Sequence, residues 1–396
     1  MVFTRTCPLP VNKKMLKIFS YGWHTAHQHE LCKLPDTHFY YIKNRIKPDW
    51  STANRPYPKN LDVVTHYEAG KYDLAILHID QQCLFGHPKG IPYNECNKMI
   101  KDIPKIVINH GTPHYQDYEP EMIARRMKEA IGDNFMVVNS YKAAEEWGFG
   151  KVIQHGLEAE EWIDNPVKEN RIIVTISPGN AEGDHTKDGW AEYYNRFFLD
   201  KVKEQVPITH IGSDITFDNF QAYKEYIGSS LIYFNPTLHS PMPRSRTEAM
   251  LSGACVVTTP FHDADTFIEN GVNGFIVKTE KEAVKTLKYL LDNPEKAKEI
   301  GQRGKKTAMR KFEKKRYQAE WLDFIASVFD SGWLPIELSE LKNKLMDLYQ
   351  IIYFSPNSLD KQTKTSFESL LETVLKDHNK RIIEKYGKNR DSDSNA

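Results

Sequence analysis

Short apolar runs alternate with amphipathic stretches along most of this chain, and this alternation limits the folds it can adopt more than any other feature. In the first part of the sequence the runs predict buried strands at Leu16–Phe19, Leu74–Ile79, Ile106–Ile108 and Phe135–Val138. Segments with a helical repeat lie between them, for example Glu121–Ile131. Strands that alternate with helices pair in parallel, so the pattern predicts βαβ units and a parallel sheet.

A second series of the same kind follows a polar connection at Glu161–Asn170, which contains Pro166. Its candidate strands are Ile172–Ile176, Ile208–Ile211, Leu231–Phe234, Cys255–Thr258 and Phe275–Val277. The remainder has a helical pattern at Glu280–Leu291, Pro294–Phe312, Tyr317–Phe329, Ile336–Tyr353 and Thr363–Tyr386. We therefore expect an α/β protein with a first domain at residues 1–164, a second at 165–325 and a C-terminal helical extension at 326–396.

Composition excludes several classes of protein. The 53 basic and 53 acidic residues balance, which argues against a dedicated nucleic-acid binder. No apolar run approaches the roughly 18 residues that a membrane span needs. The N-terminus has no apolar segment typical of a secretory signal, and the 5 cysteines form no CxxC pair. These features favour a cytoplasmic protein with reduced thiols.

The segment Asn235–Thr259 contains the most informative motif. An apolar strand ends at Asn235-Pro236, a loop follows, and a short helix is expected from about Arg246. Ser245 and Glu248 match the S-x-x-E pattern of a capping box, which predicts a structural role for Glu248. The same geometry also suits ligand binding, because a helix N-terminus at the carboxyl end of a parallel sheet attracts anions. Arg244 and Arg246 would add positive charge there.

Five pieces of the chain resemble, in the same order, the retaining glycosyltransferases of family 4. The segment that begins Glu248-Ala249-Met250 and ends Val256-Val257 is similar to the family's E-A-M-A-C-G-x-P-V-V. The other four pieces are Val137–Tyr141, Lys151–Trp162, Ile172–Gly189 and Ile268–Val277. The resemblance implies the GT-B fold, in which two Rossmann-like domains face a cleft, and a nucleoside-diphosphate sugar as donor.

The resemblance also implies roles for individual residues on the donor side. Lys187, in the loop after Gly179, corresponds to a lysine that binds the donor phosphates, and Glu248 to the carboxylate that binds the ribose. Ser245, Arg246 and Thr247 belong to the helix start that would receive the diphosphate, and Arg244 or Arg246 would replace an arginine that the family has near Gly179. Where the family has a second glutamate before Glu248, this chain has Ser240.

On the first domain, the candidate residues are His110 and Gly22. His110 follows the Ile106–Ile108 strand and resembles a family histidine that contacts the sugar, although an isolated loop histidine has no special role in most proteins. Gly22 lies where the family has a glycine loop near the donor, and a glycine lets the backbone approach a ligand closely. We place catalysis on His110, Lys187 and Glu248.

Two patterns imitate metal sites, and we assign neither to a metal. They are the histidines of His24-x-x-His27-x-His29 and the acidic pair of Asp263-Ala264-Asp265. A third pattern, His38–Asn60, interleaves aromatic residues with Arg and Lys, Arg55 among them. A solvated strand and loop is the simpler interpretation of it, and an acceptor-side surface for a polyanion or an anionic membrane is the alternative.

The sequence thus predicts a hexosyltransferase that moves a sugar from a nucleotide donor to an acceptor hydroxyl with retention of configuration and without a metal cofactor. The acceptor is open among a glycan, a lipid-linked molecule, a protein, a small molecule and, less readily, a nucleic acid. The protein would be cytoplasmic, with peripheral contact to the inner membrane face as an option. Two other functions suit the architecture: a sugar-nucleotide epimerase, and a sugar-nucleotide-binding protein without catalytic activity.

Overall fold

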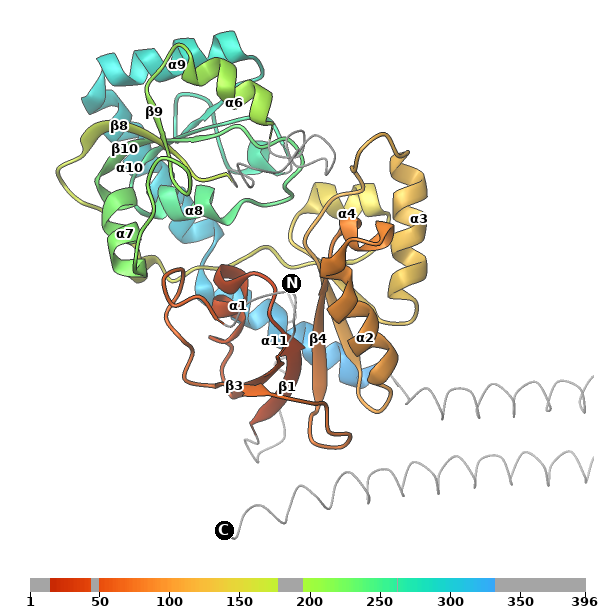
Figure 1. Cartoon of the computed structure of the whole chain (residues 1–396). Helices are drawn as coiled ribbons and strands as arrows, with labels where there is room; N and C mark the ends of the chain where they lie inside the picture. Colours follow the sequence, from red (N-terminus) through yellow and green to blue (C-terminus); the bar gives the residue numbers. More distant parts are fainter. Residues whose placement is uncertain (1–14, 44–49, 177–194, 262, 332–396) are drawn as a thin grey trace, which may run out of the picture.

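The computed structural model describes residues 15–43, 50–176, 195–261 and 263–331. The first sheet has its strands in the order β3-β2-β1-β4-β5-β6-β7, and every pair in it is parallel (Figure 1). Their bounds are β1 Leu16–Tyr21, β2 Thr37–Ile42, β3 Leu61–Val64, β4 Leu74–Ile79, β5 Lys105–Asn109, β6 Phe135–Val138 and β7 Lys151–Val152. β4 and β5 are buried along their whole length, which is why their sequences are uninterrupted apolar runs.

Helices cover both faces of this sheet. α2 (Ile91–Met99), α3 (Pro120–Ile131) and α4 (Tyr141–Trp147) pack on one face, over side chains such as Leu77 and Val107. α1 (Thr25–Leu31) packs on the other face, over Ile76 and Ile106. Short 3-10 turns follow β4 at Gln81–Phe85 and Pro88–Gly90.

The second sheet is parallel as well, in the order β12-β11-β10-β8-β9. Its strands are β8 Glu169–Val174, β9 Ile208–His210, β10 Ser230–Asn235, β11 Cys255–Thr258 and β12 Phe275–Ile276. α6 (Arg196–Lys203), α9 (Glu280–Asp292) and the first half of α10 (Pro294–Lys311) cover one face. α7 (Phe220–Ser229), α8 (Arg244–Leu251) and the second half of α10 cover the other.

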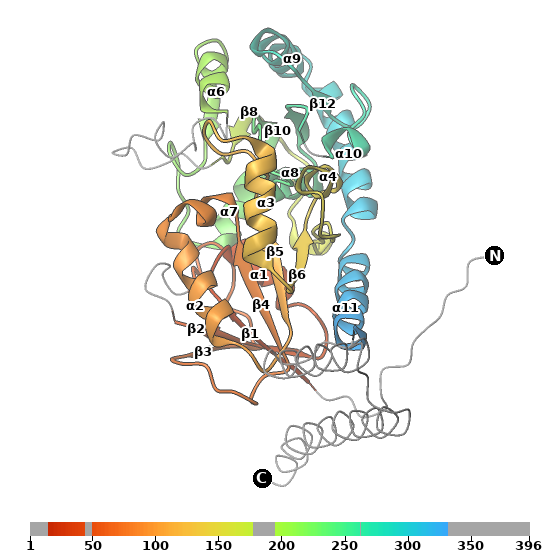
Figure 2. The ribbon, with the colours of Figure 1, turned by 90° about the vertical axis from the view of Figure 1, so that its right-hand side faces the viewer.

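The chain returns to the first domain through α11 (Lys314–Asp330), drawn in blue in Figure 2. Tyr317, Trp321 and Ile325 of α11 are buried against the same sheet face as α1. At the crossing, the backbone N–H of Leu157 donates to the carbonyl of Phe312 at 2.9 Å. The last described helix therefore belongs to the first domain by its packing, although it follows the second in sequence.

Every strand predicted from the sequence is present, with ends that differ by at most a few residues. β2, β3 and the two-residue β7 add to the first sheet, and β2 falls in the basic aromatic segment. The helices predicted at 336–353 and 363–386 lie outside the described residues. In the part of the chain that the structure describes, no helix is both long and apolar enough to cross a bilayer.

Candidate active site

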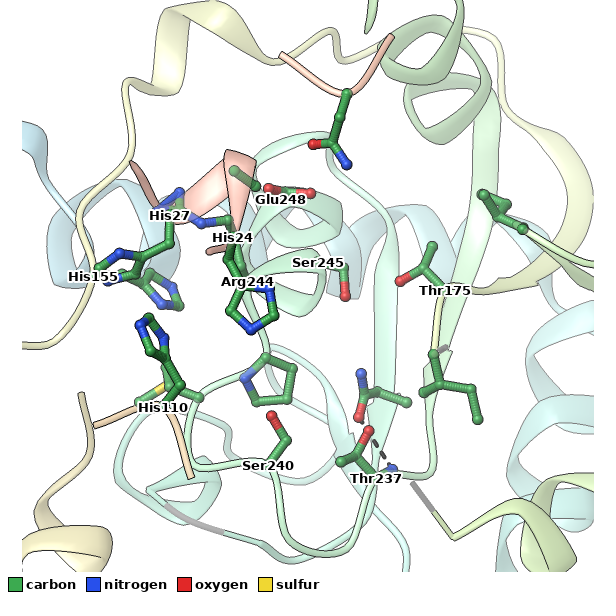
Figure 3. Close-up of a pocket in the computed structure, with 18 of the residues that line it drawn as sticks. His24, His27, His110, His155, Thr175, Thr237, Ser240, Arg244, Ser245 and Glu248 are labelled. Atoms are coloured by element: carbon green, nitrogen blue, oxygen red, sulfur yellow. Dashed lines mark hydrogen bonds between the residues drawn. The ribbon is translucent and has the colours of Figure 1, made fainter. Parts of the chain in front are cut away.

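A cavity of about 550 Å³ lies between the two domains, at the carboxyl ends of both sheets (Figure 3). Its lining follows the strand ends: His24 comes after β1, Asp80 after β4, His110 after β5, and Thr175 after β8. Ligands in open parallel sheets bind at this edge, where loops replace strands and backbone groups become free. Figure 3 shows His24, His27, His110 and His155 on one side, with Ser245, Thr175 and Thr237 opposite them.

Glu248 lines the cavity, and its buried carboxylate has two hydrogen-bond partners, one from each domain. One carboxylate oxygen accepts a hydrogen bond from the guanidinium of Arg55, and the other accepts from the hydroxyl of Tyr223 at 3.1 Å. Glu248 is 2% exposed and Arg55 4%. Burial, and then the Glu248 charge, raise the pKa of Tyr223 well above its usual value, so this hydroxyl remains a donor. The three side chains form a charged contact across the cleft.

Arg55 is a site residue that the sequence does not reveal. Its guanidinium carbon lies 4.4 Å from the ring centroid of Phe220 and 5.5 Å from that of Trp162, so two aromatic faces support the cation. The interpretation of this part of His38–Asn60 as solvated is wrong for Arg55, because the residue crosses from the first domain into the second. Its only sequence signal is a basic residue among aromatic ones, which is common on protein surfaces.

The predicted capping box does not form. α8 begins at Arg244, and the residue before it, Pro243, offers no side-chain cap. Ser245 lies inside the first turn, where its hydroxyl pairs with that of Tyr233 at 2.7 Å, and Glu248 turns to Arg55. No side chain at the N-cap pairs with the first amides of α8, and Arg244 and Ser245 of this first turn line the cavity.

The two arginines of α8 point in different directions. Arg244 lines the cavity, and its Nη1 lies 3.7 Å from Oε1 of Glu30. Among the described residues, neither terminal nitrogen of Arg244 has a hydrogen-bond partner. Arg246 is completely buried, with its guanidinium carbon 4.9 Å from the ring centroids of both Phe261 and Phe267. Arg246 therefore faces the interior of the second domain, and as it lies here it cannot bind a diphosphate in the cavity.

Thr247 also turns away from the cavity. Its hydroxyl pairs with Nε2 of His155 at 2.8 Å, and His155 itself lines the cavity. Burial, followed by the charge of Arg244, holds the pKa of His155 well below its usual value. The same two causes lower the pKa of His27. Both imidazoles are thus neutral, so neither of them adds a positive charge beside Arg244.

His110 lies on the first-domain wall, as the sequence predicts, and four rings surround it. Its ring stacks on Trp23 with centroids 5.7 Å apart, and the edges of His24 and His27 approach it at 5.2 and 5.0 Å. Nε2 of His110 lies 3.0 Å from Nδ1 of His78. Burial is the main cause that lowers the pKa of His110 well below its usual value, so the ring is neutral near pH 7.

Of the other predicted residues, Ser240 lines the cavity and Gly22 does not. A Cβ at Gly22 would meet no heavy atom within 4 Å, so packing does not require a glycine there. Gly179 and Lys187 lie outside the described residues. The structure thus brings together His110, Arg244, Ser245 and Glu248.

The metal-like patterns have other partners. His24 and His27 line the cavity, whereas Nε2 of His29 lies 3.8 Å from Glu161. A possible ligand set of His29, Glu30 and Glu161 already has a cation, since the Lys33 ammonium lies 2.6 Å from Glu161 and 3.3 Å from Glu30.

Asp263, in the Asp-Ala-Asp pattern, is fully buried and accepts hydrogen bonds from the first domain. The donors are the amides of Tyr141 and Lys142, at 2.7 and 3.1 Å, and the side chain of Gln154 at 2.8 Å. Its role in this structure is to join the start of α4 to the second domain.

Comparison with known proteins gives two findings. Residues 198–307, within the second domain, match the family model described as "Glycosyl transferases group 1". No curated protein sequence matches the chain.

Solved structures similar to this one cover most of its length. HepE of Anabaena in complex with UDP and glucose has a TM-score of 0.57 at 14% identity, over 79% of this chain and 100% of that one. Sucrose-phosphate synthase of Thermosynechococcus elongatus has a TM-score of 0.58 at 11% identity, over 80% and 100%. A glycosyltransferase of Rickettsia africae has 0.55 at 11%, over 80% and 99%. At such identities the likeness establishes the fold, which is the GT-B arrangement of two Rossmann-like domains that face a cleft.

Proposed function

We propose that this protein is a glycosyltransferase that moves a hexose from a nucleoside-diphosphate sugar to an acceptor hydroxyl. The observation that carries the proposal is the placement of α8. This helix lies in the segment that matches the glycosyltransferase family model, and it presents Arg244, Ser245 and Glu248 to a cavity opposite His110. Cations, an uncapped helix start and a carboxylate on one wall are the groups that a sugar nucleotide needs.

The donor diphosphate would bind at the start of α8. Arg244 and Ser245 of the first turn line the cavity, and the two terminal nitrogens of Arg244 have no hydrogen-bonding partner among the described residues. Lys187, after Gly179, would add the second cation at the diphosphate. Gly22 would let the backbone of the first domain approach the donor closely. Both roles stay predictions from the resemblance. HepE, with the same fold, was crystallised with UDP-glucose, which makes this sugar nucleotide the first donor to test.

Glu248 would bind the ribose hydroxyls. A carboxylate offers about four lone-pair positions, and Arg55 and Tyr223 occupy two of them in this structure. Ribose hydroxyls can use the remaining positions on the cavity side, while Arg55 holds the carboxylate in its orientation. Ser240 stands where the family's sugar-binding glutamate would lie, so we assign contact with the transferred sugar to His110 and the helix start instead.

Transfer with retention needs no nucleophile from the protein. The bond between the anomeric carbon and the phosphate oxygen breaks, the acceptor oxygen bonds to that carbon on the same face, and the leaving phosphate takes the acceptor proton. The protein would contribute position and charge: Arg244 and Lys187 stabilise the developing negative charge of the diphosphate. Enclosure between the domains would keep water from the donor. In this scheme the cations of the protein take the place of a metal.

Two measurements test the proposal. A ligand that binds only the folded state raises the melting temperature, by mass action worth about 2.7 kcal/mol at 100 times Kd. We expect this rise with one of UDP-, GDP-, ADP- or TDP-sugars, and a transfer product when acceptors are added. A change in the free nucleotide sugar without an acceptor would indicate an epimerase instead, and tight binding without either product would indicate a binding protein. The absence of any melting shift would contradict all three.

Location and acceptor are further proposals. A cytoplasmic enzyme that contacts the inner membrane face fits the basic aromatic segment, of which residues 44–49 are outside the described part of the chain. The acceptor would enter from the first-domain side, past Ser51 and Asn54, which line the cavity.

A further inference from the structure

His110 is the end of a hydrogen-bonded chain that runs behind the cavity wall. Nδ1 of His78, on β4, faces Nε2 of His110 at 3.0 Å. Nε2 of His78 faces the side-chain nitrogen of Gln28, on α1, at 3.1 Å. Gln28 is 1% exposed and His78 is completely buried, so this chain is shielded from bulk solvent. Buried side chains that hydrogen-bond to a functional histidine determine which of its nitrogens carries the proton.

The backbone fixes the orientation of the Gln28 amide. Its oxygen accepts from the backbone N–H of Trp23 at 2.7 Å, and its nitrogen donates to the carbonyl of Tyr21 at 2.7 Å. A backbone N–H can only donate and a carbonyl can only accept, so the oxygen and the nitrogen of this side chain cannot be exchanged.

The tautomers of both histidines follow from that orientation. The side-chain nitrogen of Gln28 can only donate a hydrogen bond, so Nε2 of His78 must accept it and carries no proton. The proton of the neutral His78 ring must then lie on Nδ1. The Ser20 hydroxyl, 3.3 Å from the same Nε2, already donates to the carbonyl of Ile76 at 2.6 Å and does not change this assignment. Nδ1–H of His78 then donates to Nε2 of His110. A neutral His110 that accepts at Nε2 carries its own proton on Nδ1.

We propose that Gln28 and His78 are positioning residues that hold His110 as its Nδ1–H tautomer, so that His110 meets the bound sugar nucleotide as a hydrogen-bond donor. The inference rests on the proposed function for the identity of the ligand, but the proton arrangement itself belongs to the unliganded protein. The acceptor in the ligand is a sugar hydroxyl or a phosphate oxygen.

The surroundings of His110 support a neutral donor. The charged and titratable groups near it are His24 and His27 from the α1 side, His78 from β4 and Lys89 after the turn that follows β4; each of them lowers the pKa of His110. Trp23 covers one face of the ring.

A donor at Nδ1 cannot also remove a proton through Nδ1. His110 is therefore not the general base for the acceptor hydroxyl, and in the proposed transfer the leaving phosphate takes the acceptor proton.

Nitrogen NMR of histidine-labelled protein tests the arrangement without any ligand. The ring nitrogens of the two tautomers have different shifts, and the His110 signals are identified by their loss in His110→Asn. We expect Nδ1–H in the wild-type protein. In Gln28→Glu a carboxylate oxygen replaces the nitrogen and accepts from His78, so both histidines should change to Nε2–H. Nε2–H at His110 in the wild type, or no change in a folded Gln28→Glu protein, would overturn the proposal.

A second pair of variants tests the role of His78 if Gln28→Glu does not fold. His78→Asn retains an N–H where Nδ1–H lies, whereas His78→Leu has similar bulk and no donor. We expect His110 to remain Nδ1–H in the Asn variant and to lose this preference in the Leu variant. Retention of the Nδ1–H form in both would overturn the assignment to His78.

The kinetics of His78→Asn and His78→Leu test whether the tautomer of His110 affects the rate of sugar transfer. We expect the kcat for sugar transfer to fall by about tenfold or more in His78→Leu, with the Kd for the nucleotide alone nearly unchanged, and the Asn variant to recover most of it. Equal kcat values in the two variants would overturn the proposal that the tautomer of His110 contributes to sugar transfer. If the wild type shows the Nδ1–H form but transfers no sugar from any donor, the proposed function fails and the proton arrangement stands.

Discussion

Among single residues, Arg55 and Glu248 form a buried ion pair at the cavity wall. Both side chains are at most 4% exposed, and each loses its water only because the other replaces it. Removing one partner of such a pair leaves an uncompensated buried charge, which costs about 3–5 kcal/mol. Arg55 therefore holds the Glu248 carboxylate in place, and a carboxylate is a strong acceptor for hydroxyl groups.

Glu248→Gln separates charge from shape at this position. We expect the free energy of unfolding to fall by about 2 kcal/mol or more, because Arg55 keeps its place without a counter-charge. We also expect the affinity for the nucleotide to fall by about tenfold or more, since a hydrogen bond to a charged group is worth about 1.5–3 kcal/mol. Urea denaturation and calorimetry measure the two effects.

The control for this variant is Glu129→Gln, an exposed glutamate on α3, which should change neither quantity. If Glu248→Gln loses stability but binds the nucleotide as well as the wild type does, Glu248 serves only as the partner of Arg55.

Among elements, α8 has two faces with opposite chemistry. Arg244 opens onto the cavity, while Arg246, two positions on, lies between Phe261 and Phe267. Burial lowers the pKa of Arg246 to about 10, and its Nε and Nη1 have no hydrogen-bond partner in the described part of the chain. A buried cation of this kind can be replaced by an apolar side chain of similar length at little cost.

Arg244→Met and Arg246→Met form a matched pair that tests this division. We expect Arg244→Met to weaken nucleotide binding by about tenfold or more, because a charge-assisted contact to the diphosphate is lost. We expect Arg246→Met to bind the nucleotide with wild-type affinity and to change the unfolding free energy by less than about 1.5 kcal/mol. Calorimetric titration with UDP and urea denaturation check both. A reversed order of affinities would place the diphosphate against the other face of α8.

The elements also show what the sequence could predict. The strands were predictable, because a strand buried on both faces must be a continuous apolar run, as Leu74–Ile79 is. The start of α8 was predicted one or two residues late, since Ser245 fits a capping pattern and its pairing with Tyr233 depends on β10, a neighbour that a local pattern does not include. Arg55 was missed for the same reason: its partner Glu248 is 193 residues away in sequence.

In the whole molecule, contacts at several places join the two domains beside the cavity, and two of them involve buried carboxylates. Arg55 reaches Glu248 at one of them, and Asp263 receives the amides at the start of α4 at the other. Asp263 has a positive φ of 54°, a conformation that Asp and Asn adopt more readily than most residues. Its side chain is the acceptor for three donors, of which the side chain of Gln154 is buried.

Asp263→Ala should destabilise the protein without weakening the binding of the nucleotide. Three donors lose their acceptor, and we expect the free energy of unfolding to fall by about 3 kcal/mol. Asp265→Ala is the control, because the exposed ion pair of Asp265 with Lys142 is worth at most about 1 kcal/mol. Urea denaturation compares the two, and equal losses would show that the Asp263 contacts add no stability.

The dependence of stability on pH is also a property of the whole molecule, because three histidines that line the cavity act together. Burial holds the pKa values of His27, His110 and His155 well below 6.5 in the folded protein. Below pH 6.5 the unfolded chain therefore binds more protons than the folded protein does, and acid favours unfolding. We expect constant stability above this pH, and a loss below it of up to about 1.4 kcal/mol per pH unit for each histidine.

The carboxylate of Glu161 contributes mainly to a loss of stability at lower pH. The folded-state pKa of Glu161 is lowered from 4.5 to about 2, so its stabilising contribution disappears only as the pH falls below 4.5. Urea denaturation at a series of pH values measures the slope, and His27→Gln should reduce it by about one third if the three histidines contribute equally. A stability that stays constant down to pH 4.5 would show that these histidines are protonated in the folded protein, and the neutral donor at His110 would then be lost as well.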